Sequence, residues 1–167
     1  MILRQYQDDR ARSEALYSGC GAYRYALTRD WAGGPRLLYV MLNPSTADER
    51  RNDPTVERCE RRARGLGFGA FRVVNIFAFR ATDPRDLKAA DEPVGPENDR
   101  VLSEAARWAD RILCAWGAHG AHRGRGAEVG HLLRGLGCEL WHLGLTGAGH
   151  PRHPLYLPYA RQPQPWH

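Results

Sequence analysis

The sequence predicts an α/β fold, a three-layer αβα arrangement around a central, mainly four-stranded parallel sheet. Two observations lead to this class. Short, almost wholly apolar runs of strand length recur along the chain, and segments whose apolar residues have helical spacing separate these runs. Strands that alternate with helices favour parallel pairing with right-handed crossovers. With 167 residues, of which 43% are hydrophobic, the chain is expected to form one domain with its own core.

Residues 1–35 are expected to form an N-terminal extension, either a hairpin or an edge strand, ahead of an α/β core at residues 36–160. Residues 23–28 alternate with the two-residue period of a half-buried strand. The segment W-A-G-G-P at residues 31–35 then interrupts the chain. No internal repeat is visible, so a single domain over residues 1–167 is predicted.

The core begins with a predicted strand at residues 36–42, whose apolar run is typical of a strand covered on both faces. A helix is expected next, because Asp53 can serve as its N-cap and Pro54 suits the first helical position. Gly65 and Gly67 are expected to end that helix.

A second buried strand is predicted at residues 71–77, and the polar, proline-rich residues 81–96 are predicted to form a long loop. Loops of that length in a compact domain are usually functional or mobile. The remaining predicted elements are a helix at residues 98–110, a strand at residues 112–116, a helix at residues 126–136 and a strand at residues 139–143.

The net charge is +5, from 24 Lys and Arg against 19 Asp and Glu, and the charge is distributed unevenly. Residues 111–167 hold six basic and two acidic residues together with all seven His. A basic surface in this C-terminal third would suit a polyanion such as nucleic acid. Every basic residue except Lys88 is Arg, which grips phosphate in bidentate fashion, although a GC-rich genome would equally enrich arginine.

Cysteine usage and hydropathy favour a reducing, aqueous compartment. Cys20, Cys59, Cys114 and Cys138 lie far apart without a C-x-x-C pair, so we expect buried, reduced thiols; an iron–sulfur or zinc site built from all four is the alternative. No apolar run approaches the ~18 residues of a membrane span, and the N-terminal residues lack the apolar block of a signal peptide. A soluble, cytoplasmic protein without a membrane partner is predicted.

Polar, aromatic and basic residues follow each predicted core strand. The segments are N-P-S-T at residues 43–46, N-I-F-A-F-R at residues 75–80, G-A-H-G at residues 117–120 and H-P-R-H-P-L-Y at residues 150–156. Because ligands of open α/β sheets bind outside the carboxyl ends of the strands, we expect these segments to gather around one site.

Two asparagines are the first candidates for that site. The amide of Asn43, between a strand and a proline, can orient a water or hold a ligand carbonyl, or it can merely cap the turn. Asn75 closes an apolar run, so its side chain needs a hydrogen-bond partner, either neighbouring backbone or the edge of a bound base. Phe77 and Phe79 follow at strand spacing on the face of Asn75, as core residues or as a stacking platform, and Arg80 is either solvated or binds phosphate.

Histidines are the second group of candidates. His119 and His122, and likewise His150 and His153, have the spacing of zinc ligands, but neither pair has a supporting carboxylate or cysteine, so no metal site is expected. His153, beside a proline in the basic tail, is better suited to donate a hydrogen bond to a developing anion.

The four strand-end segments resemble, in order, motifs of the uracil-DNA glycosylase superfamily. L-N-P-S resembles the G-I-N-P-G motif of its mismatch-specific branch, and V-V-N-I-F-A-F-R resembles that branch's T-N-I-V-x-R. I-L-C-A-W-G-A-H-G and H-P-R-H-P-L are similar to the W-G-x-x-A and H-P-S-P-L segments of the main branch. Over nearly its whole length, from Y-R-Y-A-L-T-R-D-W to H-P-L-Y, the chain more closely resembles the bacterial DUF1643 proteins, a resemblance that implies no reaction.

The glycosylase resemblance implies hydrolysis of the N-glycosidic bond of a damaged, deaminated or modified base, which is flipped out of single- or double-stranded DNA. It implies that Asn43 positions the attacking water, that Asn75 binds the base and that His153 or His150 stabilises the departing base. It requires neither a cofactor nor a metal, and it implies no obligate protein partner. The expected substrate contacts are Pro44, Ser45, Thr46, Asn75, Phe77, Phe79, Arg80, Trp116, His119 and Tyr156, with Arg123, Arg125 and Arg152 on the DNA backbone.

The motifs also depart from the superfamily pattern. Ser45 and Thr46 stand where the mismatch branch has a small glycine, and no Asp occupies the position of the main branch's base, although Asp48 and Asp53 are near. The alternatives are therefore a non-catalytic nucleic-acid or nucleotide-binding module of the same fold, or a hydrolase of free nucleosides or nucleotides.

Overall fold

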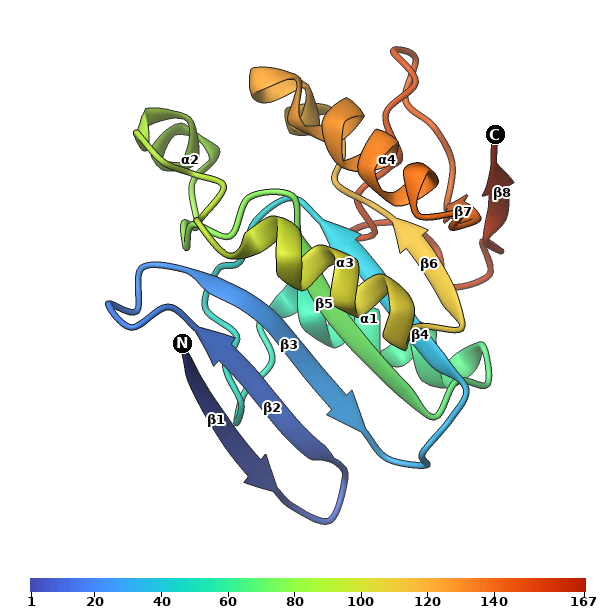
Figure 1. Ribbon diagram of the computed structural model, residues 1–167. Coiled ribbons are helices and arrows are strands. Elements are labelled where there is room, and N and C mark those ends of the chain that lie inside the picture. The colour runs from blue at the N-terminus through green and yellow to red at the C-terminus, as the bar shows by residue number, and fades with distance from the viewer.

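The computed structural model describes residues 1–167 and shows a mixed α/β fold with one eight-stranded sheet and four α-helices (Figure 1). The strands are β1 (Ile2–Gln7), β2 (Arg12–Tyr17), β3 (Arg24–Asp30), β4 (Arg36–Met41), β5 (Ala70–Asn75), β6 (Arg111–Cys114), β7 (Leu140–His142) and β8 (Gln164–Trp166). The helices are α1 (Pro54–Gly65), α2 (Pro84–Ala89), α3 (Asn98–Trp108) and α4 (Arg125–Gly135), and a 3₁₀ segment, η1 (Ala118–Gly124), precedes α4.

The strand order is β1-β2-β3-β5-β4-β6-β7-β8. The neighbours β5, β4, β6 and β7 run parallel, whereas the other four of the seven pairings are antiparallel. The four expected parallel strands are therefore present, but the sheet is larger than predicted and most of its pairings are antiparallel. The N-terminal residues contribute three strands instead of one edge strand or hairpin, and the C-terminal tail adds β8 at the opposite edge.

Helices cover both faces of the parallel strands (Figure 1). On one face α3 and α4 pack with α2 over a core that includes Leu38, Val74 and Leu102. On the other face α1 packs over a core that includes Tyr39, Cys59 and Phe71. The front faces of β1 and β2 carry no helix in Figure 1. None of the helices is long and apolar enough to cross a membrane.

The local signals for α1 are confirmed. Asp53 is its N-cap, and the carboxylate accepts a 2.9 Å hydrogen bond from the backbone N–H of Val56, while Pro54 is the first helical residue. The second carboxylate oxygen accepts from the backbone N–H of Ala47 at 3.2 Å. Asp53 therefore fixes both the start of α1 and the segment that connects β4 to it.

Other boundaries differ from the prediction. The expected loop at residues 81–96 contains α2, which begins with Asp83 as N-cap and Pro84 at its first position. Strand β5 ends at Asn75, two residues earlier than expected, because the following backbone N–H groups bond to the end of β4 instead of continuing the ladder with β3.

Candidate functional site

The segments that follow the parallel strands meet at one edge of the sheet, as predicted. After β5, the backbone N–H of Phe77 donates to the carbonyl of Leu42 at 3.0 Å. After β6, Ala115 N–H donates to Val40 at 2.8 Å, and Gly117 N–H donates to the carbonyl of Pro151 at 2.8 Å. These bonds bring three strand ends and the tail loop together, and we call this region the carboxyl edge.

Asn43 ties two of these segments together. Its side-chain nitrogen donates to the carbonyl of Ala81 at 2.7 Å and to that of Pro44 at 3.1 Å, so the amide has a fixed orientation. Ser45 and Thr82 share a hydroxyl–hydroxyl bond of 3.0 Å across the same two loops. The amide oxygen of Asn43 accepts no bond within the protein and stays available to a ligand or a water.

Asn75 lies at the end of β5, directly opposite Met41 of β4, and is 1% exposed. Its side-chain nitrogen is buried and has no hydrogen-bond partner in the protein. Such an unpaired donor costs about 1–3 kcal/mol relative to a paired one. A partner that the protein does not supply, either a water or a ligand acceptor, is therefore the natural complement of this nitrogen.

The two phenylalanines pack in the same core but to different depths. Phe77 is completely buried in the core beneath α3 and α4, with its ring 5.6 Å from the ring of His122. Phe79 is partly buried, and its ring meets that of Tyr23 edge to face at 6.0 Å. The two-residue alternation nevertheless ends with β5 at Asn75, because the consecutive residues Phe77 and Ala78 both lie in this core.

His153 lies against the end of β6 and near the start of α1. A Cβ added at Gly117 would lie 3.4 Å from the Cβ of His153, and Gly117 has φ +73°, so both close approach and backbone shape favour glycine there. The Nδ1 atom of His153 accepts from the N–H of Leu155 at 3.2 Å. Burial lowers the pKa of His153, and the carboxylate of Asp53 opposes that shift.

The other expected contacts are distributed more widely. His150 is held through its backbone by Thr146, and His119 is exposed on η1. Trp116 is 2% exposed and packs against Trp166, with ring centroids 5.6 Å apart, so its ring belongs to the core. Pro44 is buried, and Thr46 is exposed.

Tyr156 stands out at the rim of the tail loop. Its side chain is 91% exposed and its φ is +147°, a value that L-residues rarely adopt. A bulky residue in such a conformation is strained and is held there by the surrounding structure. The carbonyl of Pro154 contributes by accepting the N–H groups of both Tyr156 and Leu157 at 3.1 Å.

Two of the three arginines expected on a DNA backbone are engaged within the fold. Arg125 is only 2% exposed and bonds to the carbonyl of Ile76 and to the carboxylates of Asp99 and Glu128. The expectation that Arg125 contacts DNA is therefore corrected. Arg123 donates to two backbone carbonyls that follow α2, whereas Arg152 is exposed.

Arg80 remains at the surface of the carboxyl edge. Its guanidinium donates to the carbonyl of Gly21 at 3.1 Å and lies 5.3 Å from the centre of the Tyr17 ring. Tyr17, Arg80, Asp48 and Cys20 line a cavity of about 250 Å³ there. Both charge signs are present in this cavity.

Arg24 belongs to this region and was not among the predicted residues. It is 2% exposed, donates to the carbonyl of Ala47 at 2.7 Å, and its Nε has no partner. Burial lowers the pKa of Arg24 to about 10, and the carboxylate of Asp53 opposes the shift. The available signal was a charged residue placed directly between Tyr23 and Tyr25.

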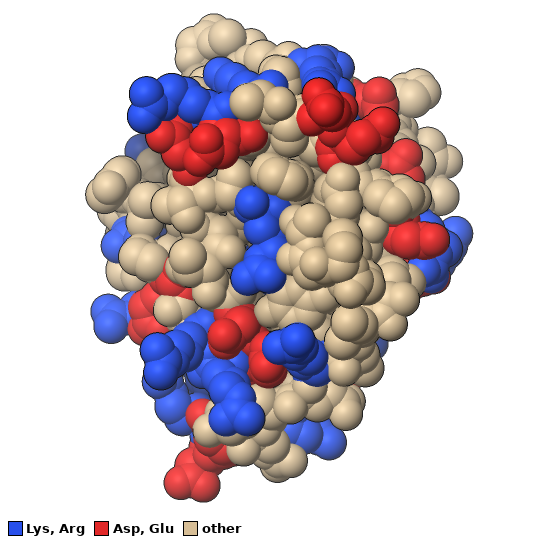
Figure 2. Space-filling view, turned by 90° about the vertical axis from the view of Figure 1, so that its left-hand side faces the viewer, with Lys and Arg blue, Asp and Glu red and all other residues tan.

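The surface carries no single basic face on the side seen in Figure 2, which is the side of β1 and α2. Basic and acidic side chains are mixed over it. Ion pairs at the surface of the protein include Arg85 with Asp83 and Arg100 with Glu97.

The comparisons with known proteins concern the family alone. No curated protein and no solved structure matches the chain. The model of the family described as protein of unknown function (DUF1643) matches residues 24–155, which include β3, all four parallel strands and the tail loop with His153. None of these comparisons bears on the uracil-DNA glycosylase superfamily. Because the match covers most of its length, the chain belongs to the DUF1643 family.

Proposed function

We propose that the protein hydrolyses the N-glycosidic bond of a damaged, deaminated or modified base in DNA, with the reaction at the carboxyl edge. The observation that supports this most is the unpaired, buried side-chain nitrogen of Asn75, at the edge where the loops of Asn43 and His153 also meet the strand ends. The resemblance of the four strand-end segments to glycosylase motifs supports the same reaction class.

Asn43 is the proposed water-positioning residue. The bonds from its side-chain nitrogen to Ala81 and Pro44 hold the amide plane, so the free amide oxygen has a defined direction. An oxygen in that position can accept a hydrogen bond from a water and orient it toward the sugar carbon.

His153 is the proposed stabiliser of the departing base. Because its Nδ1 accepts from Leu155, the neutral ring carries its proton on Nε2. The lowered pKa favours this neutral form near pH 7. When the glycosidic bond breaks, the transition state resembles an oxocarbenium ion and the base gains negative charge, which a fixed N–H donor stabilises.

Three further residues are assigned to recognition. The nitrogen of Asn75 would donate to an acceptor on the base, and Phe79, whose ring is only partly buried, is a better stacking residue than Phe77. The exposed ring of Tyr156 is available to stack on unpaired bases. DNA is the proposed partner, and the four free thiols support action in the reducing cytoplasm.

A non-catalytic nucleic-acid or nucleotide-binding module is the second candidate. One observation favours it: the amide nitrogen of Asn43 is already used between two loops, which is what a structural residue would do. Activity measurements on variants of His153 and Asn43 separate the two candidates.

The test uses oligonucleotides, single-stranded and duplex, that carry uracil, hypoxanthine, mismatches or bulky modified pyrimidines, together with free nucleosides. Formation of abasic sites or free base supports hydrolysis. No product from any substrate, together with DNA binding that persists unchanged in Asn43→Ala, would establish the binding module instead.

Variants of His153 identify the role of its distal nitrogen. His153→Asn keeps an acceptor for Leu155 but lacks the distal donor, and we expect base release to slow by roughly 10²–10³-fold. His153→Gln restores a distal donor and is expected to recover part of the rate. Thr82→Ala breaks the bond to Ser45 between the segments that follow β4 and β5, and it is the control for loosened loops elsewhere at the carboxyl edge.

A further inference from the structure

A cavity of about 320 Å³ lies between the N-terminal strands and the segment that leads into α1. Its floor is a row of facing residues, Tyr6 on β1, Ser13 on β2 and Arg29 on β3. Its other wall includes Arg51 and Asn52. Its volume lies within the range of small-molecule sites, which begins near 300 Å³.

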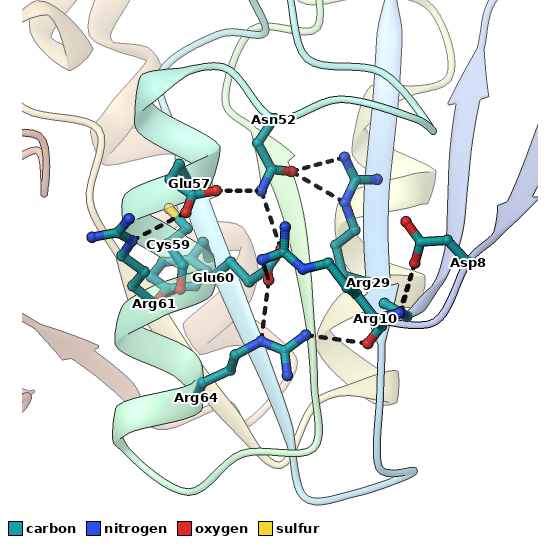
Figure 3. A network of polar contacts seen from close by, with 11 residues as sticks. Asp8, Arg10, Arg29, Asn52, Glu57, Cys59, Glu60, Arg61 and Arg64 are labelled. Atoms are coloured by element: carbon teal, nitrogen blue, oxygen red, sulfur yellow. Dashed lines mark hydrogen bonds and ion pairs between the residues drawn. The ribbon is translucent and has the colours of Figure 1, made fainter.

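Arg29 is the central group of this cavity and is 4% exposed. Its Nε and one terminal nitrogen bond to the amide oxygen of Asn52 at 3.2 and 3.0 Å (Figure 3). The same terminal nitrogen donates to the carbonyls of Asp48 at 2.7 Å and Arg51 at 3.2 Å. The other terminal nitrogen is buried without a partner, and Figure 3 shows it directed away from Asn52.

The carboxylates of Glu57 and Glu60 at this cavity are already paired within the protein. Both oxygens of Glu57 and both oxygens of Glu60 accept hydrogen bonds, from Asn52 and from arginines of α1 (Figure 3). One oxygen of Asp8 accepts from the backbone N–H groups of the β1–β2 turn at 2.9 and 3.1 Å, and its other oxygen accepts no bond within the protein. The unused charged groups that remain at the cavity are therefore this one oxygen of Asp8 and several guanidinium nitrogens.

The remaining donors belong to one hydroxyl and to arginines whose side chains make few or no hydrogen bonds within the protein. Arg51 is exposed, and its guanidinium donates no hydrogen bond within the protein. The guanidinium of Arg50 lies 4.8 Å from the centre of the Tyr6 ring, a contact that uses its face and leaves its N–H groups free. Arg10 makes only one long contact, 3.5 Å, to Glu60, and the hydroxyl of Ser13 makes none.

We infer that this cavity binds a phosphate group, with Arg29 and Ser13 at its floor and Arg50 and Arg51 at its entrance. Guanidinium groups bind phosphate oxygens with paired, charge-assisted hydrogen bonds. A buried guanidinium with an unused nitrogen gains a missing hydrogen bond when it binds such an oxygen. The phosphate can come from a free phosphate-bearing molecule or from the backbone of a nucleic acid. The inference does not depend on the proposed hydrolysis, because it concerns binding on the α1 face of the N-terminal strands.

The test is calorimetric titration of the full chain with inorganic phosphate and with a short single-stranded oligonucleotide that carries no terminal phosphate. Arg51→Gln is expected to weaken phosphate binding by roughly tenfold, the effect of one hydrogen bond to a charged group. Ser13→Ala tests the floor of the cavity in the same way. Arg107→Gln removes the same charge from an exposed position on α3, on the opposite face of the sheet, and is expected to leave binding unchanged.

Two results would overturn the inference: no phosphate binding by the native chain at millimolar concentrations, or equal weakening by Arg51→Gln and Arg107→Gln. If phosphate displaces the oligonucleotide and Arg51→Gln weakens both ligands, the site takes a nucleic-acid backbone. If phosphate binding alone depends on Arg51, the site takes a free phosphate-bearing molecule. Base release is not measured, so the outcome is independent of the proposed catalysis.

Discussion

Four arginines of the chain are buried, with at most 4% of their surface exposed, and each donates a hydrogen bond to at least one backbone carbonyl. They are Arg24, Arg29, Arg62 and Arg125. Carbonyls of loops and of the tail lie outside helices and strands and need donors when they are buried. The planar guanidinium carries five N–H donors and can bond to several carbonyls at once, whereas a lysine ammonium has three donors on one nitrogen. Some of the arginines therefore stabilise the fold and are not available to an anionic partner. The net charge alone does not distinguish these two roles.

Arg62 gives the first prediction at this scale. Its two terminal nitrogens bond to the carbonyls of Leu157, Pro158 and Arg161, and so fasten the tail to α1. We expect Arg62→Gln to lower the free energy of unfolding in urea by about 2–3 kcal/mol, because buried carbonyls lose their donors. The matched variant Arg61→Gln, at an exposed position on the same helix, should change it by less than about 0.5 kcal/mol. Equal effects would contradict a structural role for Arg62.

The second prediction concerns histidine titration. Burial lowers the pKa of His122, His142 and His153 below the ordinary value of 6.5. As the pH falls below that value, the unfolded chain takes up protons that the folded chain resists, so the free energy of unfolding should decrease. In the native chain the N–H of Gly144 donates to Nδ1 of His142 at 2.8 Å. His142→Asn keeps an acceptor for this N–H but has no ring that can take up a proton.

The measurement is the free energy of unfolding in urea near neutral pH and about one unit below the ordinary histidine value. The loss between the two conditions should be smaller in His142→Asn than in the native chain. An exposed histidine, His131, supplies the control, because His131→Asn should leave the loss as it is. A loss that His142→Asn leaves unchanged would show that this ring does not carry the effect.

At the scale of elements, the sequence predicted those helix boundaries that neighbouring residues determine. Asp53 and Pro54 mark the start of α1 in the sequence and in the structure. The same pair of residue types, Asp83 and Pro84, begins α2, which was interpreted as a loop because six residues carry too little periodicity to be recognised. Strand β8 forms only by pairing with β7, more than twenty residues earlier, and its own sequence Q-P-W gives no strand signal.

The prediction for an element concerns η1 and α4. A Cβ at Gly120 would collide with the ring of Trp116, which is buried and cannot move aside. Gly120→Ala should therefore cost about 1–3 kcal/mol, the usual effect of overpacking. Gly135, at the end of α4, has open space around its Cβ position and no unusual backbone angle, so Gly135→Ala should stabilise by up to about 1 kcal/mol. Thermal unfolding of the two variants checks the opposite signs.

Gly120→Ala also tests an interpretation of the sequence. The segment G-A-H-G at residues 117–120 was expected to contact a ligand. The structure explains Gly120 by packing on Trp116 and Gly117 by its approach to His153. A stability change without a change in DNA or phosphate affinity would agree with the packing explanation for Gly120.

At the scale of the whole molecule, the position of the predicted segments at one edge of the sheet follows from the order of the parallel strands. The strand order does not determine which polar atoms of these segments remain free of hydrogen bonds. The nitrogen of Asn43 and the guanidinium of Arg125 are used by backbone carbonyls that lie far away in the sequence. Such pairings depend on the folded positions of loops, so a list of residue types at strand ends overestimates the number available to a ligand.

The same consideration applies to the charge of +5 and leads to the last prediction. Because the buried arginines are used within the fold, and basic residues are mixed with carboxylates on the face seen in Figure 2, we expect few cations to replace the counterions of DNA. If two or three phosphates are neutralised, the logarithm of the binding constant for a single strand should fall with the logarithm of salt concentration with a slope of about −1.4 to −2.1. If the cavity at Arg51 takes a nucleic-acid backbone, Arg51→Gln should make that slope shallower by about 0.7, one phosphate contact, whereas Arg107→Gln should not. A native slope of about −4 or steeper would mean that a large basic surface forms on binding, against the mixed charge of the folded chain.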